Sequence, residues 1–282
     1  MYTAYLKIDR AVKHIIELND LFKKHRPFSY CLETNTKTGK RATYAKRVEP
    51  VTNEAAIIIG DVVHNIRASI DHAYWEVTNA FAKSEGEKNK IQFPITSTKE
   101  SFEKSVIPGL PSRVSESFAK TLLSLKPYRE DGGNKDLCAI HDLDIIDKHK
   151  LLIPTGNYTR ITSEIIQRQV PDFPSGITNF GASNCHRDVV WSIPSMNRKQ
   201  RRARKFPKSG ILEQELSVPV DIVFSVRETI DSKPVIPTLH HFIDVARQTV
   251  EALYTHKNHP TSGCTGLLRQ GWFAKKSLHN CL

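Results

Sequence analysis

The chain has 282 residues, a hydrophobic content of 39% and a charged content of 25%, which is the composition of an ordinary soluble globular protein. It contains no run of about 18 uninterrupted apolar residues and no secretory signal pattern at its mixed N-terminus. The formal net charge of +11 favours anionic partners, above all nucleic acid. The five cysteines form no CxxC pair, so we expect a cytoplasmic protein with free thiols and no thiolate zinc site.

The first part of the chain is predicted to be mostly helical. Apolar side chains recur at helical spacing over residues 3–26. Residues 28–50 alternate and turn through "NTKTGK", which predicts a β-hairpin. The strongest predicted helix covers residues 51–83, and Thr52 or Asn53 is expected to be its N-cap.

The rest of the chain changes from helix to strand and back to helix. Further helices are predicted near residues 112–126 and over residues 132–150, whereas residues 151–230 hold short β-like runs separated by turn residues. A final amphipathic helix is predicted over residues 238–256. Residues 259–282 lack periodicity, so we expect a poorly ordered tail.

This order of elements predicts an α+β fold: a helical bundle with an N-terminal β-hairpin, and a C-terminal antiparallel β-layer closed by a final helix. We expect residues 1–150 to form the bundle, with the hairpin as an insertion, and to carry the polar site. Residues 151–258 are expected to form a β-rich region with the closing helix, packed on the bundle as one unit, and residues 259–282 to form the tail.

The stretch "GDVVHNIRASIDH", residues 60–72, places polar side chains in a helix that is otherwise apolar. His64, Arg67 and Asp71 follow the spacing i, i+3, i+7 and share one stripe of the helix, with His72 beside Asp71. The alternative for any one of these residues is a place on a solvated face, where Arg67 and Asp71 would form an ordinary i,i+4 ion pair.

A second polar cluster lies in "IHDLDIIDKHK", residues 140–150. There His141, Asp144 and Lys148 share one face of the predicted helix, and His149 lies on the neighbouring face. Antiparallel helices could bring the two clusters together, and a desolvated group of imidazoles, carboxylates and cations permits acid/base chemistry. The alternative is a buried network of polar partners that fixes the register of the helices without any catalysis.

Four segments carry a resemblance to a known family: "IIGDVVHNIRASIDHAYWEV", "QFPI", "LLSLKPYREDGG" and "LCAIHDLDIIDKHKLLIP". Together they resemble a bacterial family of uncharacterised proteins with a G-D-x-x-H-N-x-R-x-x-x-D-H helix and a later I-D-K-H-[RK] segment. The resemblance covers residues 28–156 in order and spacing. It implies a shared polar site, but it implies no particular activity.

The segment from Arg67 to His72 also resembles the R-x4-H helix motif of HEPN-type ribonucleases, which are common among toxins and phage-defence proteins. In that superfamily, Arg and His of two protomers meet across a dimer interface and cut RNA without a metal. The resemblance implies that His72 is the acid/base, that Arg67 clamps the phosphate, and that the protein is a homodimer. The motif is imperfect, because Ala68 follows the arginine where a polar residue is usual.

A metal site is the main alternative to the ribonuclease, because both clusters contain nitrogen and oxygen ligands that zinc, manganese or iron accept. Neither an HExxH nor an ExxH motif occurs in the two helices, and the chain also lacks a Walker loop and a GxSxG elbow. The candidate ligands are His64, Asp71, His72, His141, Asp147 and His149.

The run "MNRKQRRARKFPK", residues 196–208, is the most basic stretch of the chain. It is either a grip on a phosphate backbone or a solvated loop between strands. The candidate nucleic-acid-binding residues are Arg198, Lys199, Arg201, Arg202, Arg204 and Lys205.

The sequence therefore predicts a metal-independent, HEPN-like ribonuclease or another RNA-acting defence or toxin protein, without a cofactor and without a membrane partner. Arg67 and His72 are the predicted catalytic residues. The first alternative is a non-enzymatic nucleic-acid-binding or scaffold protein with a buried polar network, and the second is a metal-dependent hydrolase. The supporting shell is predicted to consist of His64, Asn65, Asp71, His141, Asp147, Lys148 and His149.

Overall fold

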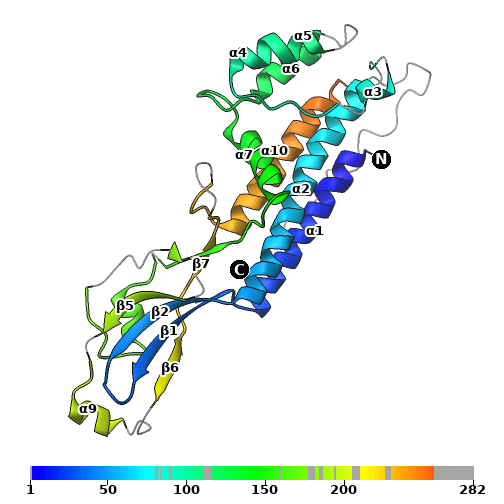
Figure 1. Ribbon diagram of the computed structural model, residues 1–282. Helices are drawn as coiled ribbons and strands as arrows, with labels where there is room; N and C mark the ends of the chain where they lie inside the picture. Colours follow the sequence, from blue (N-terminus) through cyan, green and yellow to red (C-terminus); the bar gives the residue numbers. More distant parts are fainter. Residues whose placement is uncertain are drawn as a thin grey trace.

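A computed structural model gives the fold, which combines a long helical bundle with a β-rich lobe at one end (Figure 1). The expected tail, residues 259–282, lies outside the described part of the chain, as does Lys205. The structure describes residues 2–79, 82, 84–88, 91–110, 116–158, 160–176, 182–183, 187–193, 195–204, 210–225 and 230–256.

Long helices that lie side by side form the bundle (Figure 1). Its four longest helices are α1 (Thr3–Lys24), α2 (Glu49–Thr78), α7 (Lys135–Asp147) and α10 (Val235–Tyr254). Short helical elements cover the end of the bundle that lies away from the β-rich lobe. They are α3 (Glu85–Lys88), α4 (Lys99–Ser101), the π-helical turn η2 (Phe102–Val106), α5 (Ile107–Gly109) and α6 (Glu116–Leu125).

Helix α2 is central to the bundle, and its apolar stripe is buried as its spacing predicts. Ile59, Ile66 and Ile70 are at most 1% exposed. The expectation that Thr52 or Asn53 caps this helix is wrong, because the helix begins earlier and its N-cap is Val48. Proline is tolerated in a first helical turn, where an N–H has no intrahelical partner, so Pro50 does not delay the start of the helix.

The β-rich lobe contains two antiparallel sheets. The larger sheet has the order β5-β2-β1-β6 and the smaller one β4-β3-β7. The helices α8 and α9 lie in the same lobe. The elements are β1 (Phe28–Asn35), β2 (Arg41–Arg47), β3 (Thr155–Asn157), α8 (Ser163–Gln167), β4 (Ala182–Ser183), β5 (Arg187–Ile193), α9 (Arg198–Ala203), β6 (Ile211–Leu216) and β7 (Asp221–Val223).

The N-terminal hairpin is inserted between the bundle helices α1 and α2 in the sequence, but in space it belongs to the β-rich lobe. Strands β1 and β2 are the two central strands of the larger sheet, and β5 and β6 flank them. The hairpin pattern predicted the pairing of β1 with β2, but local spacing gives no information about the partners on the outer sides. The division of the chain in space therefore differs from its division in sequence.

Each part has its own apolar core, and Ile222 packs against both. The fold is α+β with a helical bundle, an N-terminal hairpin, antiparallel sheets and a C-terminal helix, as the sequence predicts. Among the described helices, none combines the length and the apolar character that crossing a membrane requires.

Candidate functional site

The two polar clusters predicted from the sequence meet where α7 packs on α2. The imidazole Nδ1 of His64 lies 3.0 Å from Oδ1 of Asp144 and donates a hydrogen bond to it. Lys148 Nζ lies 2.6 Å from the other carboxylate oxygen of Asp144. The Asp144 side chain is only 5% exposed, whereas the His64 and Lys148 side chains are more than half exposed. Asp144 is thus a buried anion that two exposed cationic or polar groups cover.

Where α7 packs on α2, the Asp147 carboxylate lies directly against Gly60. A Cβ atom at this position would lie 2.2 Å from Oδ1 of Asp147, so any side chain there would displace the carboxylate. The pKa of Asp147 is raised by burial and, to a smaller extent, by the nearby charges of Asp144 and Asp61. This end of the interface therefore holds several carboxylates.

Arg67 is buried, and together with Asp71 it holds the backbone of Phe93. Its guanidinium donates a 2.7 Å hydrogen bond to the Phe93 carbonyl and lies 2.9 Å from Oδ1 of Asp71. The same carboxylate oxygen accepts a 2.8 Å hydrogen bond from the Phe93 N–H. We call this arrangement of Arg67, Asp71 and the Phe93 backbone the Phe93 clamp. It fixes the extended "QFPI" segment against α2.

Aromatic side chains pack around the Phe93 clamp and shield it from solvent. Phe93 is 1% exposed, and its ring meets that of Tyr74 edge-on at a centroid distance of 5.8 Å. The Arg67 side chain is 6% exposed, and burial lowers its pKa while the charge of Asp71 opposes that shift. The guanidinium therefore has protein partners and little access to solvent.

His72 points to a different part of the bundle. Its Nδ1 lies 3.1 Å from the hydroxyl of Thr3, which also hydrogen-bonds to Glu76. Residues five apart on a helix are rotated by about 140° from one another, which explains why Arg67 and His72 have different partners. Within one chain, the two predicted catalytic side chains do not converge on a common point.

The remaining residues of the predicted shell have diverse surroundings. Asn65 is buried, donates to the backbone carbonyl of Asp61 at 2.8 Å and accepts from Lys7 at 3.5 Å. His141 is half-buried, and its Nδ1 is a buried atom without a hydrogen-bond partner. Burial, followed by the charge of Arg67, lowers the pKa of His141. His149 is exposed.

The candidate metal ligands do not form a binding site. In the part of the chain that the structure describes, no three His, Cys, Asp or Glu side chains are grouped so that they could hold a metal ion. All six residues that the sequence suggested as ligands belong to that part. A metal-dependent hydrolase thus lacks a ligand set among the described residues.

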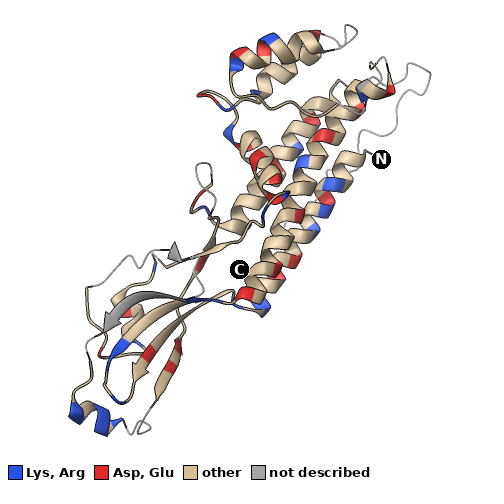
Figure 2. Ribbon diagram, viewed as in Figure 1, with Lys and Arg blue, Asp and Glu red and all other residues tan. Residues whose placement is uncertain are grey.

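Part of the basic run, Arg198–Ala203, forms the short helix α9 at the far tip of the β-rich lobe (Figure 2). Asn197 and Gln200 form a capping box at its start, a pattern that is also visible in the sequence. The helix docks on the hairpin turn between β1 and β2. Met196 N–H donates a 2.9 Å hydrogen bond to the Gly39 carbonyl, and Arg201 donates one to the Lys37 carbonyl.

Gly39 is necessary for this docking. Its φ of +76° lies in the left-handed region, and a Cβ atom there would lie 2.6 Å from the Met196 carbonyl oxygen. Arg201 is half-buried, whereas the neighbouring basic side chains point to solvent. We call these exposed side chains of α9 and the hairpin turn the basic tip: Lys37, Lys40, Arg198, Lys199, Arg202 and Arg204.

Comparisons of the chain with protein-family models, with curated proteins and with solved structures found no match. The site is therefore interpreted from its own geometry.

Some residues of the site were missing from the sequence-based list. Asp144, on which the contact between the clusters depends, belongs to the second predicted cluster but not to the predicted supporting shell, because its spacing alone does not distinguish it from other acids of the helix. Phe93 takes part through its backbone, which no side-chain pattern reveals. Lys37 and Lys40 join the basic tip only because the hairpin turn packs beside α9.

We predict that Arg67 matters to stability far more than His72 does. Replacing Arg67 by Met leaves Asp71 and the Phe93 carbonyl without their cation and should lower the free energy of unfolding by about 3 kcal/mol. His72→Ala, at a half-exposed position, should lower it by about 1 kcal/mol or less. Urea denaturation of the parent and of both variants measures these changes in the free energy of unfolding. Equal and small losses would show that the Phe93 clamp does not stabilise the fold.

We also predict a pH dependence from His141. Its pKa in the folded chain lies below the ordinary 6.5, so the unfolded chain binds more protons as the pH falls through this value. The folded chain therefore favours the neutral imidazole of His141. The stability that this gives is present above pH 6.5 and is lost as the pH falls below it. Between about pH 7.5 and about pH 5.5, the parent should lose more unfolding free energy than His141→Gln. Parallel losses in urea titrations of the two proteins would contradict this assignment.

Proposed function

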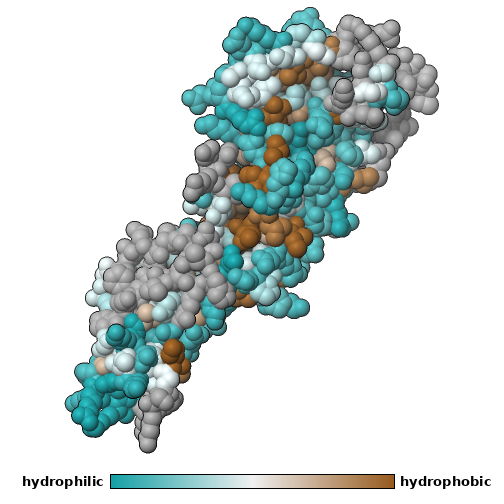
Figure 3. Space-filling model, in the orientation of Figure 1, coloured by the Kyte–Doolittle hydropathy of each residue, from teal (hydrophilic) through white to brown (hydrophobic). Residues whose placement is uncertain are grey.

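We propose that the protein binds nucleic acid, with RNA as the expected partner, through the phosphate backbone at the basic tip. The observation that carries this proposal is the convergence of two separate segments, the hairpin turn and α9, on one exposed cationic surface. The surface over α9 is hydrophilic in the space-filling view (Figure 3). Cationic side chains on such a surface bind phosphates and release their counterions.

The geometry of the basic tip supports contact with several phosphates. Arg198 and Arg202 lie one turn apart on α9, so they share a face. Arg204 lies 3.4 Å from Asp172, which Arg41 also neutralises at 2.6 Å, so the local acid is already paired. The net charge of +11 adds a long-range attraction of the same sign.

The interface between α2 and α7 is less suited to holding phosphate. In the Phe93 clamp, the Arg67 guanidinium already binds the Phe93 carbonyl and Asp71. The nearby carboxylates of Asp61, Asp144 and Asp147 would repel an anion. The polar network there is therefore proposed to hold α2, α7 and the "QFPI" segment in register. This is the non-enzymatic alternative of the sequence, in which the network fixes the fold and the basic run binds. The described cysteines, Cys31 and Cys138, are free and buried, which suits a cytoplasmic protein.

We predict that RNA binding depends on the basic tip and on salt. Replacing Arg198, Lys199 and Arg202 together by Gln should weaken binding by about tenfold or more at low salt. For a single strand, the slope of log K against log salt should become shallower by about 2, at about 0.7 per lost phosphate contact. Arg201 and Arg204 stay unchanged, because they hold α9 in place. Filter binding to a single-stranded RNA across a salt series measures both quantities.

The matched control removes the same charge elsewhere. Lys99, Lys104 and Lys120 lie on short helices at the opposite end of the molecule, where they form exposed ion pairs that contribute little to stability. Replacing all three by Gln should leave the affinity and the salt slope close to those of the parent. An equal loss in both triple variants would contradict the proposal, because only the total charge would then matter.

Ribonuclease action is a separate proposal, and the observation in its favour is that His72 is partly exposed. Because loss of Arg67 is expected to destabilise the fold, the test uses His72→Ala, which should fold normally. A homodimeric, metal-independent ribonuclease should cut RNA in excess EDTA, and His72→Ala should abolish the cleavage. Cleavage that persists in the variant, or no cleavage by the parent, would reject this role of His72.

A further inference from the structure

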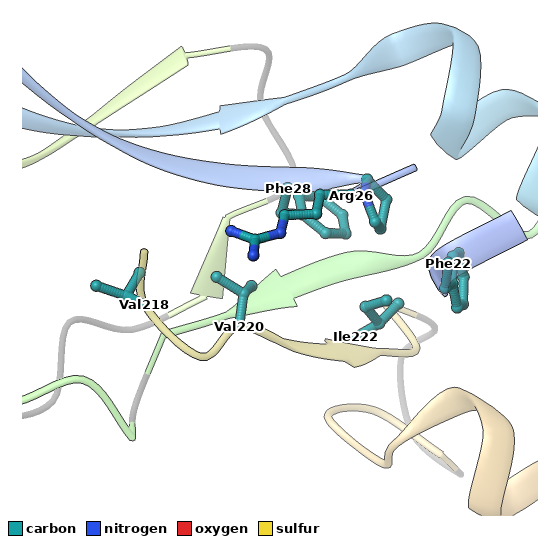
Figure 4. Close-up of a pocket in the computed structure, with 7 residues that line it drawn as sticks. Phe22, Arg26, Phe28, Val218, Val220 and Ile222 are labelled. Carbon is teal, nitrogen blue, oxygen red and sulfur yellow. The ribbon is translucent and has the colours of Figure 1, made fainter. Parts of the chain in front are cut away.

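A cavity of about 260 Å³ lies where the bundle joins the β-rich lobe (Figure 4). One side comes from the end of α1 and the start of β1, and the other from the segment that joins β6 to β7. Its volume lies just below the range of about 300–1,000 Å³ that is typical of small-molecule pockets. Six of the seven lining residues have apolar side chains, although polar atoms form nearly half of the lining surface. The six are Phe22, Pro27, Phe28, Val218, Val220 and Ile222.

The walls on the β1 side are fixed by the surrounding structure. Phe28 is 4% exposed, and a Cβ atom on Gly156 would lie 2.9 Å from its ring. Strand β3, which contains Gly156, therefore packs directly against the Phe28 ring. The carbonyl of Pro27, which also lines the cavity, accepts a 2.9 Å hydrogen bond from the N–H of Val48. A ligand would therefore meet a largely preformed surface.

One charged side chain, Arg26, lines this cavity, and it is exposed to solvent at the cavity mouth. Figure 4 shows the side chain extended beside Phe28, with the guanidinium directed toward Val220. The last turn of α1 adds Lys23 and Lys24 close to it in the chain. Among the described acidic residues, none forms an ion pair with Arg26, Lys23 or Lys24, whereas Asp221 at the start of β7 is paired with Arg160 at 3.0 Å. The charge at the cavity is positive.

We propose that this cavity binds a small amphipathic anion, an apolar body that carries one oxyanion head group. The apolar walls would bury the body, and the guanidinium of Arg26 would bind the head group with two parallel hydrogen bonds. Carboxylate and phosphate both match the planar fork of an arginine. Binding here does not depend on nucleic-acid binding at the basic tip, because the two surfaces share no residue.

The test compares four compounds that share one tail: octanoate, octyl phosphate, octanol and octylammonium. Isothermal titration calorimetry on the full chain should show saturable binding of at least one of the two anions, with octanol and octylammonium about tenfold weaker or more. The tighter of octanoate and octyl phosphate identifies the head group. Absence of saturable binding by both anions, or equal binding of octanol, would overturn the proposal.

Two variants locate the site. Arg26→Leu replaces the guanidinium by an apolar side chain and so removes the charge. The affinity for the anions should then fall about tenfold, toward that of octanol. Arg10→Leu is the matched control, because Arg10 is exposed on α1, the helix that precedes Arg26, and does not line the cavity. Val220→Trp should fill the cavity and reduce binding of all four compounds, and Val218→Trp serves if that variant does not fold. Anion binding that is unchanged in Arg26→Leu, or in a folded tryptophan variant, would refute the assignment.

Discussion

The buried guanidinium of Arg67 is the interaction on which the rest of the bundle depends. A cation at a position that is 6% exposed requires compensation, and it receives it from the Asp71 carboxylate and the Phe93 carbonyl. Because the same carboxylate also accepts the Phe93 N–H, the segment after α2 is fixed in position and in register. The aromatic packing of Tyr74 on Phe93 follows from that position. The clamp is therefore a structural device assembled from residue types that are common in active sites.

The second buried charge, Asp144, has a similar role between helices. It joins α7 to α2 through His64 and is covered by Lys148 from its own helix. Gly60 permits this approach because a larger residue would collide with Asp147. Catalysis at this interface would need a substrate to reach groups that already bind one another, whereas a register-fixing network needs only these contacts. At the basic tip, Arg204 is paired with Asp172, whereas Arg198, Lys199 and Arg202 form no ion pair with any described residue.

The sequence predicted the elements well where one periodicity dominated a long stretch. The helical spacing from Ile59 to Ile70 identified the buried face of α2, and the alternation around "NTKTGK" identified the hairpin. It left open whether the two polar clusters meet, although polar groups in two apolar helices need partners, and the structure joins them through His64 and Asp144. It did not predict which sheet the hairpin joins, because partners of a strand are set by contacts between residues far apart in the chain. The Phe93 clamp was hidden for another reason: its acceptor and its donor are backbone groups.

The measurement that tests this account most directly is amide hydrogen–deuterium exchange of the full chain with and without single-stranded RNA. If the basic tip binds RNA and the polar network is structural, RNA should slow exchange in the hairpin turn around Gly39 and in α9, and it should leave α2 and α7 unchanged. Protection centred on residues 64–72 and 141–149, with none at α9, would contradict the account and would place the RNA-binding surface at the polar clusters.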